Sequence, residues 1–388
     1  MTTRFLVIGG GIVGASISYH LAVEGAEVLL LERRGIGAEA SGASAGGVRQ
    51  QRRHMLEIGL AVASVQRWPD LDRELGTSLD YQRCGGLQLA VDETDEKRLR
   101  RTIEHDRAAG LQDVYWVDEQ RCRELVPHLG PDVRGGSYCP TDGRVDPVAA
   151  TRAFATAAYR LGARVMVGRQ VVRLIFREDR VCGVVDAKGE ELGADLVINA
   201  AGAWGPTLHR QLHHALPVEM RIPQMMATLP ARGRLLEQVV GLRRRGDERG
   251  ISLKQLPSGS FMIGGGWGAA KDAAGRPTVD PENARRAIDL AADVIPAIRD
   301  LPVERFWFGK EAQTVDALPV VGAVPDVAGY LTAFGFSGHG LAIAPAIGAA
   351  VADLAVGRVP RHSVRGLAPR RFLGVGLETV PNEAPSAG

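Results

Sequence analysis

Three glycines near the start of the chain have the types and spacing that point most directly to chemistry. Gly9, Gly11 and Gly14 form a G-x-G-x-x-G pattern directly after the strand-like apolar run at 4–8. In a strand–turn–helix unit the first glycine permits a tight turn. The second lets the backbone approach a pyrophosphate, and the third lets the helix pack closely on the strand. The N–H groups of the helix N-terminus then face the phosphates.

An acid stands where the next apolar run ends. Glu32 follows Gly14 by eighteen residues, close to the separation at which an acid accepts hydrogen bonds from an adenosine ribose. An acid at this place disfavours a 2′-phosphate. The pattern therefore predicts a dinucleotide site, with the phosphates at the glycines and the adenosine ribose at Glu32.

Two further features consist of small residues. The loop at 35–47 reads GIGAEASGASAGG, and such residues let a large flat ligand lie against the backbone. A flexible linker is the alternative, which we disfavour because the loop directly follows Glu32. A second small-residue turn, Ala200–Trp204, follows the apolar strand predicted at 196–199. Ligands of open α/β sheets gather at such strand ends.

The elements that position these residues alternate between helix and strand. A chain of 388 residues exceeds the roughly 250–300 at which one core stops growing. We therefore expect an α/β fold (α+β overall), with an interrupted Rossmann-like nucleotide-binding domain and a second, mainly antiparallel-sheet substrate domain. The expected boundaries are 1–78, 140–205 and 306–373 for the first domain, 79–139 and 206–305 for the second, and 374–388 for a flexible tail.

Composition excludes several classes of protein. A net charge of +2 gives no case for nucleic-acid or membrane binding, and we interpret the basic run 243–245 as a solvated loop. The four cysteines are scattered without C-x-x-C, and the histidines show no ligand spacing, so we expect no metal and a reducing cytosol. We see no signal peptide. The apolar stretch 341–356 contains Pro345 and Asp353, which predicts a buried helix and no membrane span.

Several linked motifs resemble one family, the FAD-dependent D-amino acid oxidase-like (DAO) oxidoreductases, which include glycine and sarcosine oxidases. The resemblance covers roughly 4–372 and is strongest to the β-type subunits of heteromeric sarcosine oxidase, proline or hydroxyproline dehydrogenase, opine oxidase and hydrogen cyanide synthase. The motifs that carry it are VIGGGIVG, LLERRGIGAEASGASAGG, DGRVDP, VINAAGAW, LKQLPSGSFMIGGGW, DALPVVG and GFSGHGLAIAPAIG.

The resemblance implies FAD as the cofactor. Its pyrophosphate would lie at Gly9–Gly14, with Ile12 and Val13, and its adenosine at Glu32 and Arg33. Its ring would lie near the small-residue loop and the glycine turn at 335–340, here called the late glycine turn, where a helix N-terminus would stabilise the reduced ring. Beyond the residues already named, the implied FAD contacts are Ser41, Ser44, Ala45, Gly46, Gly47, Val171, Ala201, Gly202, Trp204, Gly309, Gly335, Gly338, His339, Gly340 and Leu341. Covalent attachment in monomeric sarcosine oxidases uses a cysteine after a W-x-G segment. This chain has none beyond Cys182, so we expect non-covalent FAD.

The substrate side rests on fewer residues. In the resembling sarcosine oxidases an arginine after the small-residue loop, on the helix beside the flavin, anchors the substrate carboxylate. Arg49 and Arg52 match that spacing, and a guanidinium binds a carboxylate with two parallel hydrogen bonds. A surface arginine cluster at a helix start is the alternative. Lys254 matches a family lysine beside the flavin that helps to activate oxygen. The alternative is a solvated lysine on an edge strand. His339 is either a base or a residue that shapes the site.

One position departs from the family. Where many members carry an arginine two residues after the glycine of W-x-G, this chain has Glu311. A buried unpaired carboxylate is costly, so we hypothesise that the substrate carries a second basic group.

Three functions remain open. The first is oxidation of the C–N bond of an amino acid, secondary, N-substituted or opine-like, to an imine, by a dehydrogenase or an oxidase. The second is oxidation of a 2-hydroxy acid on the same fold. The third is a flavoprotein subunit that acts mainly within an electron-transfer complex. The first would take a small amino acid or amine, with other subunits of a heteromeric dehydrogenase as further partners.

Overall fold

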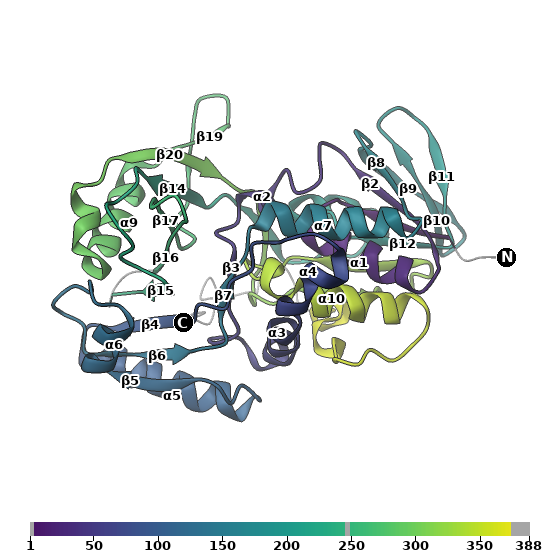
Figure 1. Cartoon of the computed structure of the whole chain (residues 1–388). Coiled ribbons are helices and arrows are strands. Elements are labelled where there is room, and N and C mark those ends of the chain that lie inside the picture. The colour runs from purple at the N-terminus through teal and green to yellow at the C-terminus, as the bar shows by residue number, and fades with distance from the viewer. Residues whose placement is uncertain (1–3, 245–248, 374–388) are drawn as a thin grey trace.

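The computed structural model describes residues 4–244 and 249–373. The expected tail at 374–388 and the last arginine of the basic run 243–245 lie outside the described residues. Figure 1 shows two lobes, each built around one large sheet, with the chain passing between them more than once.

The first lobe is a mostly parallel sheet of six strands in the order β22-β23-β12-β1-β2-β8. Only the edge strand β22 runs antiparallel to its neighbour. Five of the strands are apolar runs that are mostly buried, as parallel strands covered on both faces require, while the edge strand β8 is partly exposed. Their bounds are β1 Arg4–Ile8, β2 Glu27–Glu32, β8 Arg164–Val167, β12 Leu196–Asn199, β22 Val320–Ala323 and β23 Tyr330–Phe334.

Successive side chains of β1 point to opposite faces of this sheet. Phe5 and Val7 pack against the helices on one face, while Leu6 and Ile8 pack against a three-stranded sheet on the other. The helices are α1 Ile12–Val23, α3 Met55–Arg67, α4 Leu71–Leu75, α7 Pro147–Arg160 and α10 Gly340–Ala355. The three strands are β9 Val171–Arg177, β10 Arg180–Asp186 and β11 Glu191–Gly193.

The predicted buried helix is confirmed as α10, which contains Pro345 and packs on α1 and α3. Among residues 4–244 and 249–373, no helix is long and apolar enough to cross a membrane.

The second lobe is an eight-stranded sheet in the order β20-β14-β17-β16-β15-β4-β6-β5. All its pairs are antiparallel except β4 with β15, so the expected mainly antiparallel sheet is confirmed. Its strands are β4 Gly86–Ala90, β5 Tyr115–Asp118, β6 Gly135–Cys139, β14 Gln224–Thr228, β15 Val239–Leu242, β16 Ile251–Gln255, β17 Phe261–Gly264 and β20 Val303–Phe308. Its helices are α5 Glu93–Ala108, α6 Glu119–Leu125 and α9 Pro281–Val294.

Short elements complete the fold. Two two-stranded ribbons matter for the site: β3 Gly47–Val48 with β7 Gly143–Arg144, and β13 Val218–Arg221 with β21 Glu311–Thr314. The others are α2 Ala40–Ala43, α8 Gly205–His209, β18 Ala270–Lys271 and β19 Pro277–Thr278. Along the chain, groups of strands from the first large sheet alternate with groups from the second. This order supports the expected domain boundaries, which remain a proposal.

Candidate active site

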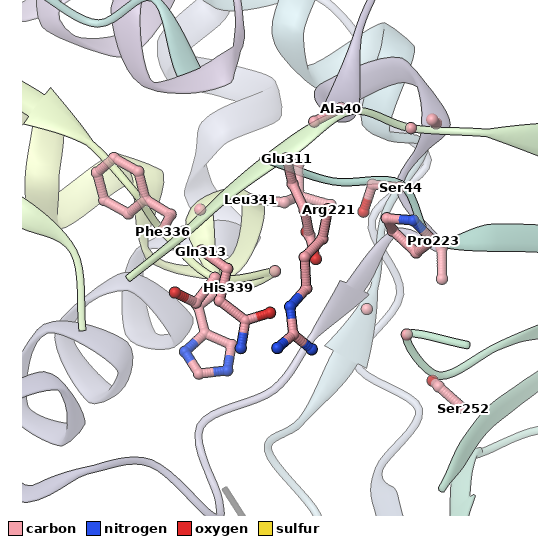
Figure 2. A pocket seen from close by; sticks show the side chains of 18 of the residues that line it. Ala40, Ser44, Arg221, Pro223, Ser252, Glu311, Gln313, Phe336, His339 and Leu341 are labelled. Carbon is pink, nitrogen blue, oxygen red and sulfur yellow. The ribbon is translucent and has the colours of Figure 1, made fainter. Parts of the chain in front are cut away.

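A cavity of about 460 Å³ opens where the two lobes meet. Its walls come from the carboxyl ends of parallel strands in the first lobe, from the small-residue loop, and from β13, β15, β16 and β21. The volume lies in the range of roughly 300–1,000 Å³ that is usual for ligand sites. Figure 2 shows side chains from these different segments around one space.

The turn from β1 into α1 has the geometry that its glycines predict. Gly9 has a φ of +107°, and a Cβ there would lie 2.5 Å from the carbonyl oxygen of Ala200. A Cβ on Gly14 would lie 1.9 Å from the carbonyl oxygen of Gly9. Gly11, by contrast, lines the cavity, and a Cβ there would meet only the Ser41 hydroxyl, at 3.1 Å. The backbone is therefore open to close approach by a ligand at this point.

Two helix N-termini face the cavity. Ile12 and Val13 of α1 and Gly340 and Leu341 of α10 all line it. The two helices are tied together, because the Ser16 hydroxyl donates to the Ala344 carbonyl at 2.9 Å. Each N-terminus presents N–H groups and a partial positive charge, the arrangement that holds phosphate. With the glycine cradle beside it, this wall fits a dinucleotide pyrophosphate.

Glu32, which the sequence predicts at the adenosine, lies beside that wall. Its buried carboxylate accepts the N–H groups of Gly10 and Arg34, each at 2.7 Å. Oε1 also accepts the Gly35 N–H at 3.3 Å, while Oε2 accepts only the Gly10 N–H and keeps acceptor capacity for a ribose hydroxyl. The Arg33 guanidinium lies 3.4 Å from the centre of the Trp204 ring, so these two residues contact each other.

The structure brings most of the predicted residues to one cavity and leaves some outside it. The residues that line it are Gly11, Ile12, Val13, Ser41, Ser44, Ala45, Gly47, Arg49, Arg52, Gly202, Gly309, Glu311, Gly335, Gly338, His339, Gly340 and Leu341. Gly9, Gly14, Glu32, Arg33, Gly46, Val171, Ala201, Trp204 and Lys254 do not. Val171 packs with Leu6 and Leu29 under the sheet, and its contact with a cofactor stays a prediction.

The resemblance implied that Arg49 and Arg52 lie on a helix, and this prediction is wrong. They lie on the segment between β3 and α3, which begins only at Met55. Arg52 has a φ of +58°, a left-handed backbone that costs about 1 kcal/mol or more for a residue with a Cβ. The buried carboxylate of Asp106 accepts the Arg52 N–H at 2.6 Å and holds this conformation.

The same segment contributes a third arginine that the sequence did not single out. Arg53 donates to the Arg49 carbonyl at 3.0 Å and also lines the cavity. Burial, and then the neighbouring charge of Arg49, lower the pKa of Arg53 to about 9, so it is still charged at neutral pH. The Arg49 guanidinium has no hydrogen bond or ion pair within the described part of the chain. The segment therefore presents positive charge to the cavity.

His339 is paired with an acid that sequence reasoning missed. Its Nδ1 lies 3.0 Å from Oε2 of Glu57, whose side chain is buried in the first turn of α3. Burial acts to raise the pKa of Glu57, but His339 and then Arg53 outweigh it and leave that pKa below its usual value. Burial lowers the pKa of His339, and the charge of Arg53 lowers it further. Glu57 acts in the opposite direction but does not cancel the fall.

Both directions favour an ionised Glu57 and a neutral His339 near neutral pH. An ionised carboxylate only accepts, so a neutral His339 carries its proton on Nδ1, and Nε2 is left as an acceptor. Nothing in the sequence places Glu57 beside a histidine 282 positions later.

Lys254 is buried inside the second sheet, on β16 between β15 and β17, with 5% of its surface exposed. The alternative interpretation of Lys254 as a solvated lysine on an edge strand is therefore wrong. Its Nζ lies 2.9 Å from the place that a Cβ on Gly46 would take, so it touches the small-residue loop between two residues that line the cavity. Burial, and then Arg144, lower the pKa of Lys254 to about 8.

Glu311 faces the cavity opposite a cation that the sequence did not reveal. It pairs across the β13–β21 ribbon with Arg221, and both line the cavity. Its Oε2 lies 3.6 Å from the place that a Cβ on Gly338 would take, so it points to the late glycine turn. Burial raises the pKa of Glu311 to about 7, and Arg221 acts against this rise.

A comparison with known families agrees with this geometry. Residues 4–354 match the model of the DAO family, described as FAD dependent oxidoreductases. The chain belongs to this family of flavoenzymes. FAD is therefore its cofactor, and the glycine cradle, the two helix N-termini and Glu32 are the groups that would hold it.

Members of the family are similar over nearly the whole chain. A 4-methylaminobutanoate oxidase (formaldehyde-forming) from Paenarthrobacter nicotinovorans is 28% identical over 96% of this chain, which spans only 46% of that protein. Glycine oxidase from Bacillus subtilis is 26% identical and is covered to 92%. Among solved structures, L-proline dehydrogenase from P. horikoshii is 30% identical with a TM-score of 0.87, covering 96% of this chain and 98% of that one.

Proposed function

We propose that this flavoenzyme oxidises the C–N bond of an amino acid whose nitrogen carries a second substituent, giving an imine. The observation that carries the proposal is the meeting of an arginine-rich segment with the flavin-binding wall in one cavity. FAD, when bound, supplies the acceptor for the hydride that leaves the carbon next to nitrogen.

Arg49 and Arg52 are the residues that we assign to the substrate carboxylate. Both line the cavity beside the small-residue loop, and a guanidinium suits a carboxylate because of its two parallel donors and permanent charge. The strained backbone of Arg52, held by buried Asp106, fixes where this segment enters the cavity. A positioned carboxylate orients the neighbouring C–H bond.

His339 handles the proton in this proposal. An amino acid in water is a zwitterion, and its ammonium must lose one proton before the C–H bond can be broken as a hydride. The neutral ring, oriented by Glu57, offers Nε2 to that proton. Loss of the hydride then gives an iminium ion, which water hydrolyses to a carbonyl compound and an amine.

Lys254 and the cysteines bear on two further parts of the proposal. The buried ammonium against Gly46 supports a role in the reaction with oxygen. The described cysteines are all free thiols, and none lines the cavity, which supports non-covalent FAD. Acid precipitation tests attachment: the expected supernatant is yellow, and a yellow pellet contradicts the proposal.

The relatives support an amine substrate. By their names, one oxidises a methylamino acid, one oxidises glycine and one dehydrogenates L-proline. Two of these three compounds are secondary amines, which favours a substituted nitrogen here.

The test is an anaerobic screen in which loss of the flavin absorbance reports reduction. We expect secondary amino acids to bleach the purified chain, primary amino acids to do so more slowly, and 2-hydroxy acids not at all. Bleaching by hydroxy acids alone would overturn the proposal. Admission of air to the bleached protein then separates an oxidase, which recovers its colour quickly, from a dehydrogenase.

A further inference from the structure

The charged side chains around the cavity are almost all positive. One lining residue, Glu311, is acidic. The cationic lining residues are Arg49, Arg52, Arg53, Arg221, Arg243, Arg249 and Lys310. A single substrate carboxylate and a pyrophosphate held by helix N-termini do not account for cations distributed over several walls.

Arg221 is the best-positioned of the cations away from the β3–α3 segment. It ends β13, and its strand pairs residue by residue with β21, placing it opposite Glu311 and diagonal to Gln313. Residues at such positions share a face of the ribbon, and all three line the cavity. Figure 2 shows the Arg221 side chain extending into the cavity, with its guanidinium at the end.

The Arg221 guanidinium makes no hydrogen bond and no ion pair within 4 Å to any described residue. Glu311 lies opposite but not within that distance. Burial also keeps the Glu311 carboxyl partly protonated near neutral pH, so it does not neutralise Arg221. A cation held in place by a strand pair and left without a partner is an anion-binding group.

We propose that Arg221 binds a second carboxylate of the substrate, which is then a secondary amine with a carboxylate on each of its two carbon substituents. The inference rests on the proposed function for the first carboxylate, at Arg49 and Arg52. It replaces the sequence-based hypothesis of a second basic group, because cations outnumber the single acid among the residues that line the cavity.

The test compares a diacid with its half-amide, which has the same shape but one charge less. The substrate pair is N-(2-carboxyethyl)glycine and N-(2-carbamoylethyl)glycine, followed by anaerobic flavin reduction. The binding pair replaces the amine nitrogen by sulfur, which gives a thioether diacid and its half-amide that cannot be oxidised at a C–N bond. Calorimetry on the FAD-loaded protein measures their affinity.

We expect the wild-type protein to bind the thioether diacid about 10- to 100-fold more tightly than the half-amide, the factor for one charge-assisted contact. Arg221→Met should remove this preference by weakening only the diacid, and Arg221→Lys should retain part of it. Arg285→Met, at an exposed arginine on α9 away from the cavity, is the matched control and should change neither affinity.

Equal affinities of the wild-type protein for diacid and half-amide would overturn the inference, as would an Arg221→Met variant that loses both equally. If Arg221→Met does not fold, the wild-type preference and Arg221→Lys decide the question. A diacid preference without flavin reduction by any amine refutes the proposed function and leaves Arg221 as an anion site. Flavin reduction by both amines at equal rates, with no preference in binding, supports the proposed function and refutes the second carboxylate site at Arg221.

Discussion

Lys254 offers a sharp test because its burial has a calculable cost. Lowering its pKa from the usual 10.5 to about 8 corresponds to roughly 3 kcal/mol of unfavourable free energy for the charged side chain in the folded state. Only 5% of the residue is exposed, so solvent screening relieves little of this. The methionine variant, which has similar length and no charge, should therefore be more stable than the wild type at pH 7, by up to about 3 kcal/mol.

The pH dependence has a definite sign. Between about pH 8 and 10.5 the unfolded chain binds more protons at Lys254 than the folded protein does, so this residue makes wild-type stability rise with pH. The advantage of Lys254→Met should therefore be largest below pH 8 and should disappear near pH 10.5. Urea unfolding at several pH values and equal FAD concentration measures this difference.

The control is Lys271→Met, at an exposed lysine on the β18–β19 hairpin, which should leave stability unchanged. A Lys254→Met variant that is less stable at pH 7, or whose advantage does not change with pH, would refute the reasoning. The same variant should reoxidise its reduced flavin more slowly in air if Lys254 acts on oxygen. A stabilised protein with slower reoxidation would show that the buried charge is retained for function.

Two further predictions concern the walls of the cavity. Gly14→Ala should lower both the melting temperature and the FAD content, which is read from the ratio of absorbance at 450 and 280 nm. The new Cβ would lie 1.9 Å from the Gly9 carbonyl oxygen, and overpacking costs about 1–3 kcal/mol. The control Gly59→Ala, in helix α3 with nothing within 4 Å, should be neutral or stabilising by about 0.5–1 kcal/mol; equal behaviour of the two variants contradicts the argument. Glu57→Gln should slow flavin reduction about 10- to 100-fold or more. It should also move the acid limb of the pH–rate profile to lower pH, because Glu57 acts to raise the pKa of His339. A slower rate with an unmoved acid limb would mean that Glu57 has only a structural role.

The sequence predicts the features that depend on local order. Gly9 and Gly14 report a turn and a close helix contact that involve neighbours in the chain, and the structure has both. The apolar runs of β1 and β2 and the buried helix α10 follow from composition in the same way. Motif order then placed the small-residue loop and the late glycine turn at one ligand, and both line the cavity.

The sequence alone does not predict which residues far apart in the chain come into contact. Arg221 meets Glu311 only through a strand register, and neither β13 nor β21 carries a signal that selects the other. Glu57 is in an ordinary helical position, and only the packing of α10 on α3 brings His339 to it. An alternating strand pattern likewise leaves open whether Lys254 lies at an edge or in the middle of a sheet, which decides its burial.

The β13–β21 ribbon is a two-stranded unit that belongs to neither large sheet. Its two strands pair with each other, and β21 is also bridged to the late glycine turn, by Gln313 with Phe336 and by the Ser337 N–H that donates to the Ala312 carbonyl. Exchange of Arg221 on β13 can therefore change the substrate range within this scaffold, whereas exchanges at Glu311 and Gln313 also act on the late glycine turn. The ribbon is accordingly the place where an engineer would begin a library of variants with new amine specificity.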